Sequence, residues 1–246
     1  MWPYFSWDHV NVGMAGGFVI AVSGVWIAVG LLKTRGLLVT GDARKINHAT
    51  ALAGGAIWFF GADDRVLRST CQVATGILFG LLLLACWHRR LWPFKYAYVG
   101  YARESDQPHA AFHVWFSWFV SIAGLLLVDV AFGNLALTRV AALVLGVADA
   151  VAEPIGTRFG IHKFAVRDIL TAAPRFRSWE GTGAVAIATF AVVLMTCGSI
   201  IPSGQLIPWA LAAAGLIAIV EACTPHGFDN FTIPISAAWL LQTIVR

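Results

Sequence analysis

Charge is what this chain has least of. Only 12% of its 246 residues are charged and 59% are hydrophobic, whereas a soluble domain carries roughly 25% charged residues. The mean hydropathy is +0.74, so the composition excludes an ordinary soluble domain and predicts an integral membrane protein. The formal net charge is +4. In so apolar a chain this excess indicates cytoplasmic Lys and Arg beside anionic lipid, and no nucleic-acid partner is expected.

Paired cysteines, internal repeats and a standard phosphate loop are also missing. The four cysteines (Cys71, Cys86, Cys197 and Cys223) lie in or beside apolar segments and form no CxxC pair. Isolated cysteines of this kind are typical of buried apolar positions. No repeat of the type that marks many transporters is found. No segment matches the G-x-x-x-x-G-K-[ST] pattern of nucleotide-binding loops.

Long hydrophobic runs fill the chain instead. A bilayer span needs about 20 mostly apolar residues, and runs of this length are helical because a closed barrel shows short alternating segments. The sequence therefore predicts an all-α, polytopic membrane helix bundle, with a single transmembrane domain over residues 1–246. We expect about seven or eight spans, of which the second and eighth are short. The candidates are residues 10–32, 47–62, 66–87, 109–132, 135–153, 182–201, 206–223 and 230–245.

Most of the basic residues lie in three of the loops between the apolar runs. Lys and Arg are enriched in the cytoplasmic loops of membrane proteins. We therefore expect loops 33–46, 88–108 and 154–181 and the short turn 224–229 to face the cytoplasm, and both termini to face outward. The basic residues of the three larger loops are Lys33, Arg35, Arg44, Lys45, Arg89, Arg90, Lys95, Arg103, Arg158, Lys163, Arg167, Arg175 and Arg177.

Two carboxylates, Asp149 and Glu153, end the apolar run 135–153. They are one helical turn apart, so a continuous helix would place them on one face. Pro154 disfavours helical geometry at the residue before it, and the sequence predicts that the helix ends at Glu153. Such carboxylates are costly unless they are solvated, paired or bound to a metal. We interpret them as a Mg²⁺ site, because Mg²⁺ takes one or two carboxylates plus substrate phosphates. The alternative is a solvated helix end with Arg158 as the partner.

Glycines and cations follow these carboxylates. Gly156 and Gly160 flank Arg158, and glycine lets backbone N–H groups approach an anion closely. The basic run favours polyphosphate binding, with contact to anionic lipid as the alternative. The candidate nucleotide-binding residues are Arg44, Lys45, Gly156, Arg158, Gly160, Lys163, Arg167, Arg177, Ser178, Glu180 and Gly181.

Ser178, Glu180 and Gly181 precede the sixth apolar run. Ser178 is a candidate N-cap, and the N-terminus of the helix beyond it favours an anion such as phosphate. A cap does not account for Glu180, which stands among cations. We therefore take Glu180 as a candidate Mg²⁺ ligand.

A further group stands on the turn between the last two spans. Glu221, Asp229 and Asn230 are oxygen donors that suit Mg²⁺ or the acceptance of a hydroxyl proton, and His226 lies among them. In the alternative interpretation, Asp229 and Asn230 only start the last helix.

Arg44, Lys45 and His48 open the second apolar run. The cations suit phosphate, and His48 suits a lipid hydroxyl or the orientation of a carboxylate, although a single His is more often structural. The candidate catalytic residues are Asp149, Asp229, Glu221 and His48, and the candidate metal ligands are Asp149, Glu153, Glu180 and Asn230.

Together these motifs resemble the CTP-dependent polyprenol kinase family, which includes dolichol, phytol and farnesol kinases and the CTP-dependent diacylglycerol kinases. A more distant similarity is to phosphatidate cytidylyltransferase. Family members often carry Lys-Thr or Lys-Ser where this chain has Arg177-Ser178. The matching patterns are Arg44-Lys45-x-x-His48, Asp149-Ala-x-Ala-x-x-x-Gly156, Phe159-Gly160-x-x-Lys163, Ser178-x-Glu180-Gly181-Thr182 and Asp229-Asn230-x-x-x-Pro234.

The resemblance implies a lipid-alcohol kinase. Such an enzyme transfers the γ-phosphate of CTP to phytol, farnesol, a polyprenol or a similar lipid alcohol, with Mg²⁺, at the cytoplasmic membrane surface. The alternatives are a cytidylyltransferase that makes a CDP-lipid and, from another class, a transporter. Charge gathered at one surface argues against the transporter. The expected partners are the bilayer, a lipid alcohol and a nucleotide, with a homodimer as one option for assembly.

Overall fold

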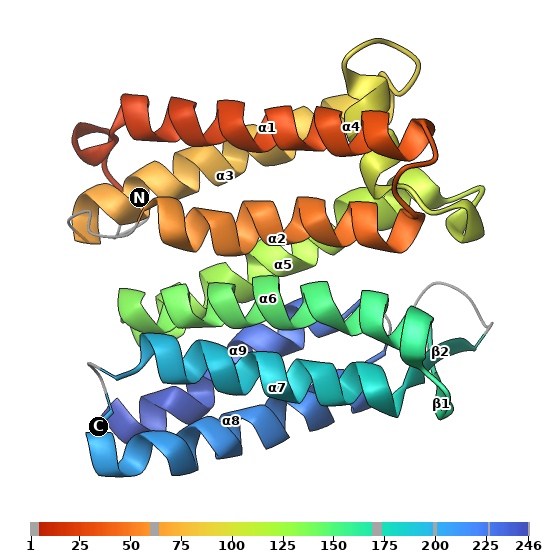
Figure 1. Cartoon of the computed structure of the whole chain (residues 1–246). Coiled ribbons are helices and arrows are strands. Elements are labelled where there is room, and N and C mark those ends of the chain that lie inside the picture. Colours follow the sequence, from red (N-terminus) through yellow and green to blue (C-terminus); the bar gives the residue numbers. More distant parts are fainter. Residues whose placement is uncertain (1–4, 60–63, 169–173, 199–200, 226, 246) are drawn as a thin grey trace. The chain divides into compact units, whose positions relative to one another are not determined.

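The computed structural model describes residues 5–59, 64–168, 174–198, 201–225 and 227–245, and these are mostly helical (Figure 1). Two 3-10 turns, η1 (Trp7–His9) and η2 (Glu104–Asp106), and two strands, β1 (Lys163–Val166) and β2 (Arg175–Ser178), complete them. The prediction of an all-α membrane helix bundle is confirmed. The α-helices of the described part are α1 (Val12–Thr34), α2 (Thr40–Trp58), α3 (Asp64–Trp87), α4 (Phe94–Tyr101), α5 (Ala110–Phe132), α6 (Leu135–Phe159), α7 (Trp179–Thr196), α8 (Ser203–Cys223) and α9 (Asp229–Val245).

Six of the described helices are long and apolar enough to cross a bilayer, namely α1, α3, α5, α6, α7 and α8. The two predicted spans outside this set are the two short ones, which form α2 and α9. A helix of 17 residues such as α9 is about 26 Å long, less than the ~30 Å of a hydrocarbon core. In α2 the first two turns carry Asp42, Arg44 and Lys45. The apolar helices indicate an integral membrane protein, while the number of crossings and their sidedness stay predictions.

The chain forms two compact units, Met1–Phe119 and Val120–Arg246; the single transmembrane domain stays a prediction. In the first unit α1 packs against α2, α3 and α4. Gly30 permits the close approach of α1 to α4, because a Cβ at this position would overlap the backbone carbonyl of Tyr96. The rings of Trp26, Tyr101 and Trp118 meet edge to face, with centroids 5.3 to 6.2 Å apart. An aromatic cluster thus forms part of this core.

The second unit is built from antiparallel packing of α6 on α7, α7 on α8 and α8 on α9, with α9 also contacting α6 (Figure 1). Val144, Leu145, Val185 and Ile217 are fully buried between these helices. Lipid is as apolar as such side chains, so helix association depends on close packing and on polar contacts rather than on a hydrophobic driving force. The ion pairs that Arg177 forms with Glu221 and Asp229 lie at the end of the unit where α6 passes into α7.

Helix α6 does not end at Glu153. It continues through Pro154 to Phe159, so the prediction from Pro154 is wrong. A proline within a helix removes one backbone hydrogen bond and strains the residue before it, but membrane helices tolerate this where side chains and neighbouring helices compensate. Asp149 and Glu153 therefore share one face of a continuous helix.

Candidate active site

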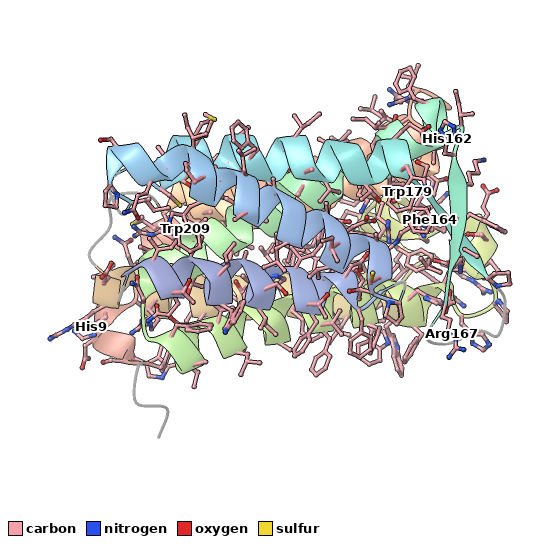
Figure 2. The ribbon with its side chains drawn as sticks, turned by 90° about the horizontal axis from the view of Figure 1, so that it is seen from below. His9, His162, Phe164, Arg167, Trp179 and Trp209 are labelled. Carbon is pink, nitrogen blue, oxygen red and sulfur yellow. The ribbon has the colours of Figure 1, made fainter. Side chains whose placement is uncertain are left out.

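A two-stranded antiparallel hairpin connects α6 to α7. Lys163 pairs with Ser178, and Phe164 pairs with Arg177. Side chains alternate across a strand, so Phe164 and Arg177 share one face while Lys163 lies on the other. Figure 2 shows Phe164 beside Trp179 at the α7 end of the hairpin, and their ring centroids are 5.0 Å apart. The register therefore separates the basic residues of this loop onto two faces.

Arg177 is the centre of a buried charged network. Its Nε lies 3.3 Å from Glu221 Oε1, and its Nη2 donates to Asp229 Oδ2 at 3.0 Å. The Thr182 hydroxyl donates to Glu221 Oε2 at 2.9 Å. The side chains of Arg177, Glu221 and Asp229 are only 10%, 9% and 14% exposed. One guanidinium thus forms ion pairs with two carboxylates, which come from the ends of α8 and α9. We call Arg177, Thr182, Glu221 and Asp229 the Arg177 network.

One nitrogen of the same guanidinium forms no hydrogen bond with any residue that the structure describes. Arg177 Nη1 is buried and has no partner among the described residues. A guanidinium carries five N–H donors in a rigid fork, and here Nε and Nη2 face carboxylates. The N–H groups of Nη1 are therefore donors that no described residue uses.

Asp149 of α6 adds a third carboxylate. It is buried, with 7% of its surface exposed, and lies near enough to Glu221 to interact with it electrostatically. Glu153, one turn further on, is half-buried. Within the described residues no group of three or more His, Cys, Asp or Glu side chains is arranged to hold a metal by itself. Two carboxylates on one helix face do fit Mg²⁺, which completes its coordination with substrate phosphates and water.

Glu180 has a local partner. Its Oε1 lies 2.8 Å from His162 Nδ1, and the backbone N–H of His162 donates to the same oxygen at 3.2 Å. The carboxylate therefore links His162, the residue before β1, to the first turn of α7 by two hydrogen bonds. Its role as a metal ligand stays a prediction.

The glycines and Ser178 have a packing explanation. Ser178 is the N-cap of α7, as predicted, and its Oγ accepts a hydrogen bond from Gly181 N at 3.1 Å. A Cβ at Gly156 or Gly160 would lie 2.9 or 2.6 Å from Ser178 Oγ. A Cβ at Gly181 would lie 2.9 Å from the Ala152 carbonyl oxygen. These glycines let α6 and α7 approach closely at this end, and phosphate binding by them stays a prediction.

The other cations of the loop are more exposed than Arg177 or are paired elsewhere. Arg158, Lys163 and Arg167 are exposed, and Arg175 Nε lies 2.8 Å from the buried Asp168. Arg167 lies at the end of the hairpin opposite Trp179 (Figure 2). Contact of Arg158 and Lys163 with a nucleotide stays a prediction.

The two interpretations of Asp229 and Asn230, as oxygen donors of a site and as residues that start the last helix, both apply to Asp229. Asp229 is the first residue of α9, and its Oδ1 accepts a hydrogen bond from Asn230 N at 3.0 Å. Its other oxygen belongs to the Arg177 network, so the residue both starts the helix and enters the site. Asn230 is buried, with 5% exposed. His226 lies outside the described residues.

Arg44, Lys45 and His48 belong to α2 of the first unit. Lys45 and His48 are each 5% exposed, so this motif is more buried than a solvated helix start would be. The participation of the three residues in one site with Glu221 stays a prediction.

Sequence reasoning missed the partner of Arg177 and the part played by Thr182. The alternation of Arg175, Phe176 and Arg177 before the helix is a strand signal that predicts opposite faces for neighbouring residues. Thr182 follows the Ser178 cap by one turn, which places it on the same side of α7 as the cap. Comparison of the chain with family models, with curated proteins and with solved structures gives no match.

Proposed function

We propose that this protein is a membrane-embedded kinase that transfers the terminal phosphoryl group of a nucleoside triphosphate to a lipid alcohol. The observation that carries the proposal is the Arg177 network, a compact and buried set of charges at the ends of apolar helices. Phosphoryl transfer requires mainly positioning and neutralisation of charge. At the end of a helix bundle such a site meets a hydroxyl group at the membrane surface while the apolar tail of the alcohol stays in lipid. CTP as donor and an isoprenoid alcohol as acceptor come from the family resemblance.

Asp229 is the best candidate for the general base. Both carboxylates have two partners, Glu221 in Arg177 and Thr182 and Asp229 in Arg177 and the backbone N–H of Asn230, but Glu221 is the less exposed of the two. Asp229 stands at the first residue of α9, where its carboxylate is 14% exposed. A carboxylate in this role accepts the proton of the substrate hydroxyl, as the catalytic Asp of protein kinases does. Glu221 then acts by orienting Arg177.

Arg177 Nη1 is the donor that we assign to the triphosphate. It is a buried nitrogen without a hydrogen-bond partner in the described part of the chain, whereas Arg167 lies at the far end of the hairpin (Figure 2). Asp149 and Glu153 would hold Mg²⁺. The ion supplies neutralisation of the phosphate charge when it is bound.

The proposed step balances as an in-line displacement. The hydroxyl oxygen of the alcohol forms a bond to the γ-phosphorus, and the bond from that phosphorus to the β,γ-bridging oxygen breaks. The hydroxyl proton passes to Asp229, and the nucleoside diphosphate leaves with the electron pair of the broken bond. The products are a lipid monophosphate and a nucleoside diphosphate.

The test is turnover by purified protein in nanodiscs. The protein is incubated with Mg²⁺ and either CTP or ATP, together with phytol, farnesol, a long polyprenol or diacylglycerol. We expect nucleoside diphosphate and lipid monophosphate to form in equal amounts with one alcohol. Release of pyrophosphate with phosphatidate, and no diphosphate with any alcohol, would replace the kinase by a cytidylyltransferase. Solute flux in liposomes without nucleotide would instead support a transporter.

A further inference from the structure

The hairpin and the residues beside it expose large apolar side chains. Phe159 is 65% exposed, Ile161 81%, Phe176 68% and Trp179 61%. Phe176 pairs with Ala165 on the face of the hairpin opposite to Arg177. Apolar side chains gathered on a surface mark a site of interaction with a protein or a membrane. We call the face of the hairpin that carries Phe176 and Ala165 its outer face. Its exposed apolar side chains indicate that this face contacts another molecule or a membrane.

Cations stand among these apolar side chains. Arg158 is exposed directly before Phe159. Lys163 is exposed and shares the outer face with Phe176, because Lys163 pairs with Ser178 and Ala165 pairs with Phe176. Aromatic and aliphatic side chains mixed with Lys and Arg are typical of surfaces that lie in the headgroup layer of an anionic membrane. We call Arg158, Phe159, Ile161, Lys163 and Phe176 the hairpin surface; Trp179 is left out of it, because its ring contacts Phe164 of the opposite face.

The place of the hairpin surface in the chain selects a bilayer as its partner. Phe159 is the last residue of α6 and Trp179 the first residue of α7, and both helices are candidate spans. The surface is thus held at the ends of two apolar helices, where headgroups begin. Trp is enriched at this depth because its ring is apolar and its N–H is polar.

We propose that the hairpin surface docks on the anionic headgroup layer of the membrane that holds α6 and α7, with Ile161 and Phe176 inserted and Arg158 and Lys163 against lipid phosphates. The hairpin then has two functional faces, since lipid contacts the outer face while Arg177 belongs to the charged network on the inner one. This docking does not require that the site transfer phosphate.

The test is amide hydrogen exchange of the full-length protein, followed by mass spectrometry of residues 159–168 and 174–179. The protein is studied in detergent, in nanodiscs of phosphatidylcholine, and in nanodiscs that also contain phosphatidylglycerol. We expect exchange in the anionic nanodiscs to be slower than in detergent by roughly tenfold, because insertion of large apolar side chains opposes opening of the hairpin. The phosphatidylcholine nanodiscs are expected to lie between the two.

Phe176→Ser should lose most of this protection. Ala165→Ser is the matched control, because Ala165 is exposed on the same face and pairs with Phe176 but has no apolar bulk. Unchanged exchange in α7 and α8 shows that the variant is folded, and Ile161→Ser provides a second variant if Phe176→Ser does not fold.

Three outcomes would overturn the proposal. Equal exchange rates in detergent and in all nanodiscs would show that the hairpin surface does not bind the membrane, and would favour a soluble protein as its partner. Equal exchange rates in the two kinds of nanodisc would show that anionic headgroups are not required. Retention of protection in both Phe176→Ser and Ile161→Ser would show that these side chains do not insert.

Discussion

Arg177 Nη2 lies 3.0 Å from Asp229 Oδ2, although the two residues are 52 positions apart in the chain. The contact joins β2 to the first residue of α9, while the same guanidinium reaches Glu221 at the end of α8. The charged network is therefore also the polar link between three segments of the second unit. Arg177 should matter for stability as well as for activity.

Removal of Arg177 is expected to destabilise the protein. Arg177→Ala leaves two buried carboxylates without their cation, which typically costs about 3–5 kcal/mol. Arg177→Lys should recover only part of this loss, because an ammonium group does not match two carboxylates with a rigid fork. Thermal unfolding in detergent measures the effect, with Arg167→Ala as the control, since Arg167 is exposed. An Arg177→Ala protein as stable as the wild type would contradict this role.

Asp229→Asn should separate chemistry from folding. The amide keeps the shape of the side chain and one oxygen that accepts from Arg177. It loses the hydrogen bond from Asn230 N, and it does not take a proton. We expect kcat to fall by about 10²- to 10⁴-fold, with a smaller change in the melting temperature than Arg177→Ala causes. Turnover is measured in nanodiscs with the acceptor that the wild type uses. Near-normal kcat would move the base to another residue.

Thr182→Val tests the orientation of Glu221. The substitution removes the hydroxyl that donates to Glu221 Oε2 and keeps the branched shape, so we expect a loss of about 1–3 kcal/mol of stability from a buried acceptor without its donor. Gly183 follows in the same helix and its Cβ position is open, which makes Gly183→Ala a suitable control. Denaturant or thermal unfolding of both variants measures their free energy of unfolding relative to the wild type. If Thr182→Val matched the wild type, the hydrogen bond would contribute nothing.

Glycine contacts between α6 and α7 predict a position-dependent effect. Gly181→Ala places a Cβ 2.9 Å from the Ala152 carbonyl oxygen, whereas Gly183→Ala meets nothing within 4 Å. We expect Gly181→Ala to destabilise by about 1–3 kcal/mol through overpacking. Gly183→Ala should be neutral or stabilise by up to about 1 kcal/mol, because Ala is the better helix former. Equal melting temperatures for the two variants would show that the helices separate without cost.

Mg²⁺ dependence tests Asp149. Chelation by EDTA should abolish turnover, and added Mg²⁺ should restore it. Asp149→Asn weakens a hard oxygen ligand, so a higher Mg²⁺ concentration should be needed for half-maximal turnover, and kcat should fall at any concentration. Glu104→Gln in the first unit is the control, because Glu104 is exposed. A normal Mg²⁺ profile for Asp149→Asn would exclude it as a ligand.

The positions of the helices follow from local properties of the chain. Each predicted apolar run contains a helix over most of its described residues, because a backbone in lipid satisfies its hydrogen bonds within one segment. The two runs predicted as short are those outside the six candidate spans. The rule for residues before proline failed at Glu153, since it describes an isolated chain and not a helix held by its neighbours.

The sequence by itself determined the class of the protein and the kinds of side chain near its charged loop, because both depend on composition and on local spacing. Only the tertiary structure decided which carboxylates Arg177 contacts and which face of the hairpin Lys163 occupies. A contact across 52 positions depends on how α7, α8 and α9 pack. A shift of one residue in strand register would move every side chain of the hairpin to the opposite face, so the register determines on which face each side chain lies. Asp149, Glu221 and Asp229 were therefore foreseen as candidates, whereas their common link to Arg177 required the fold.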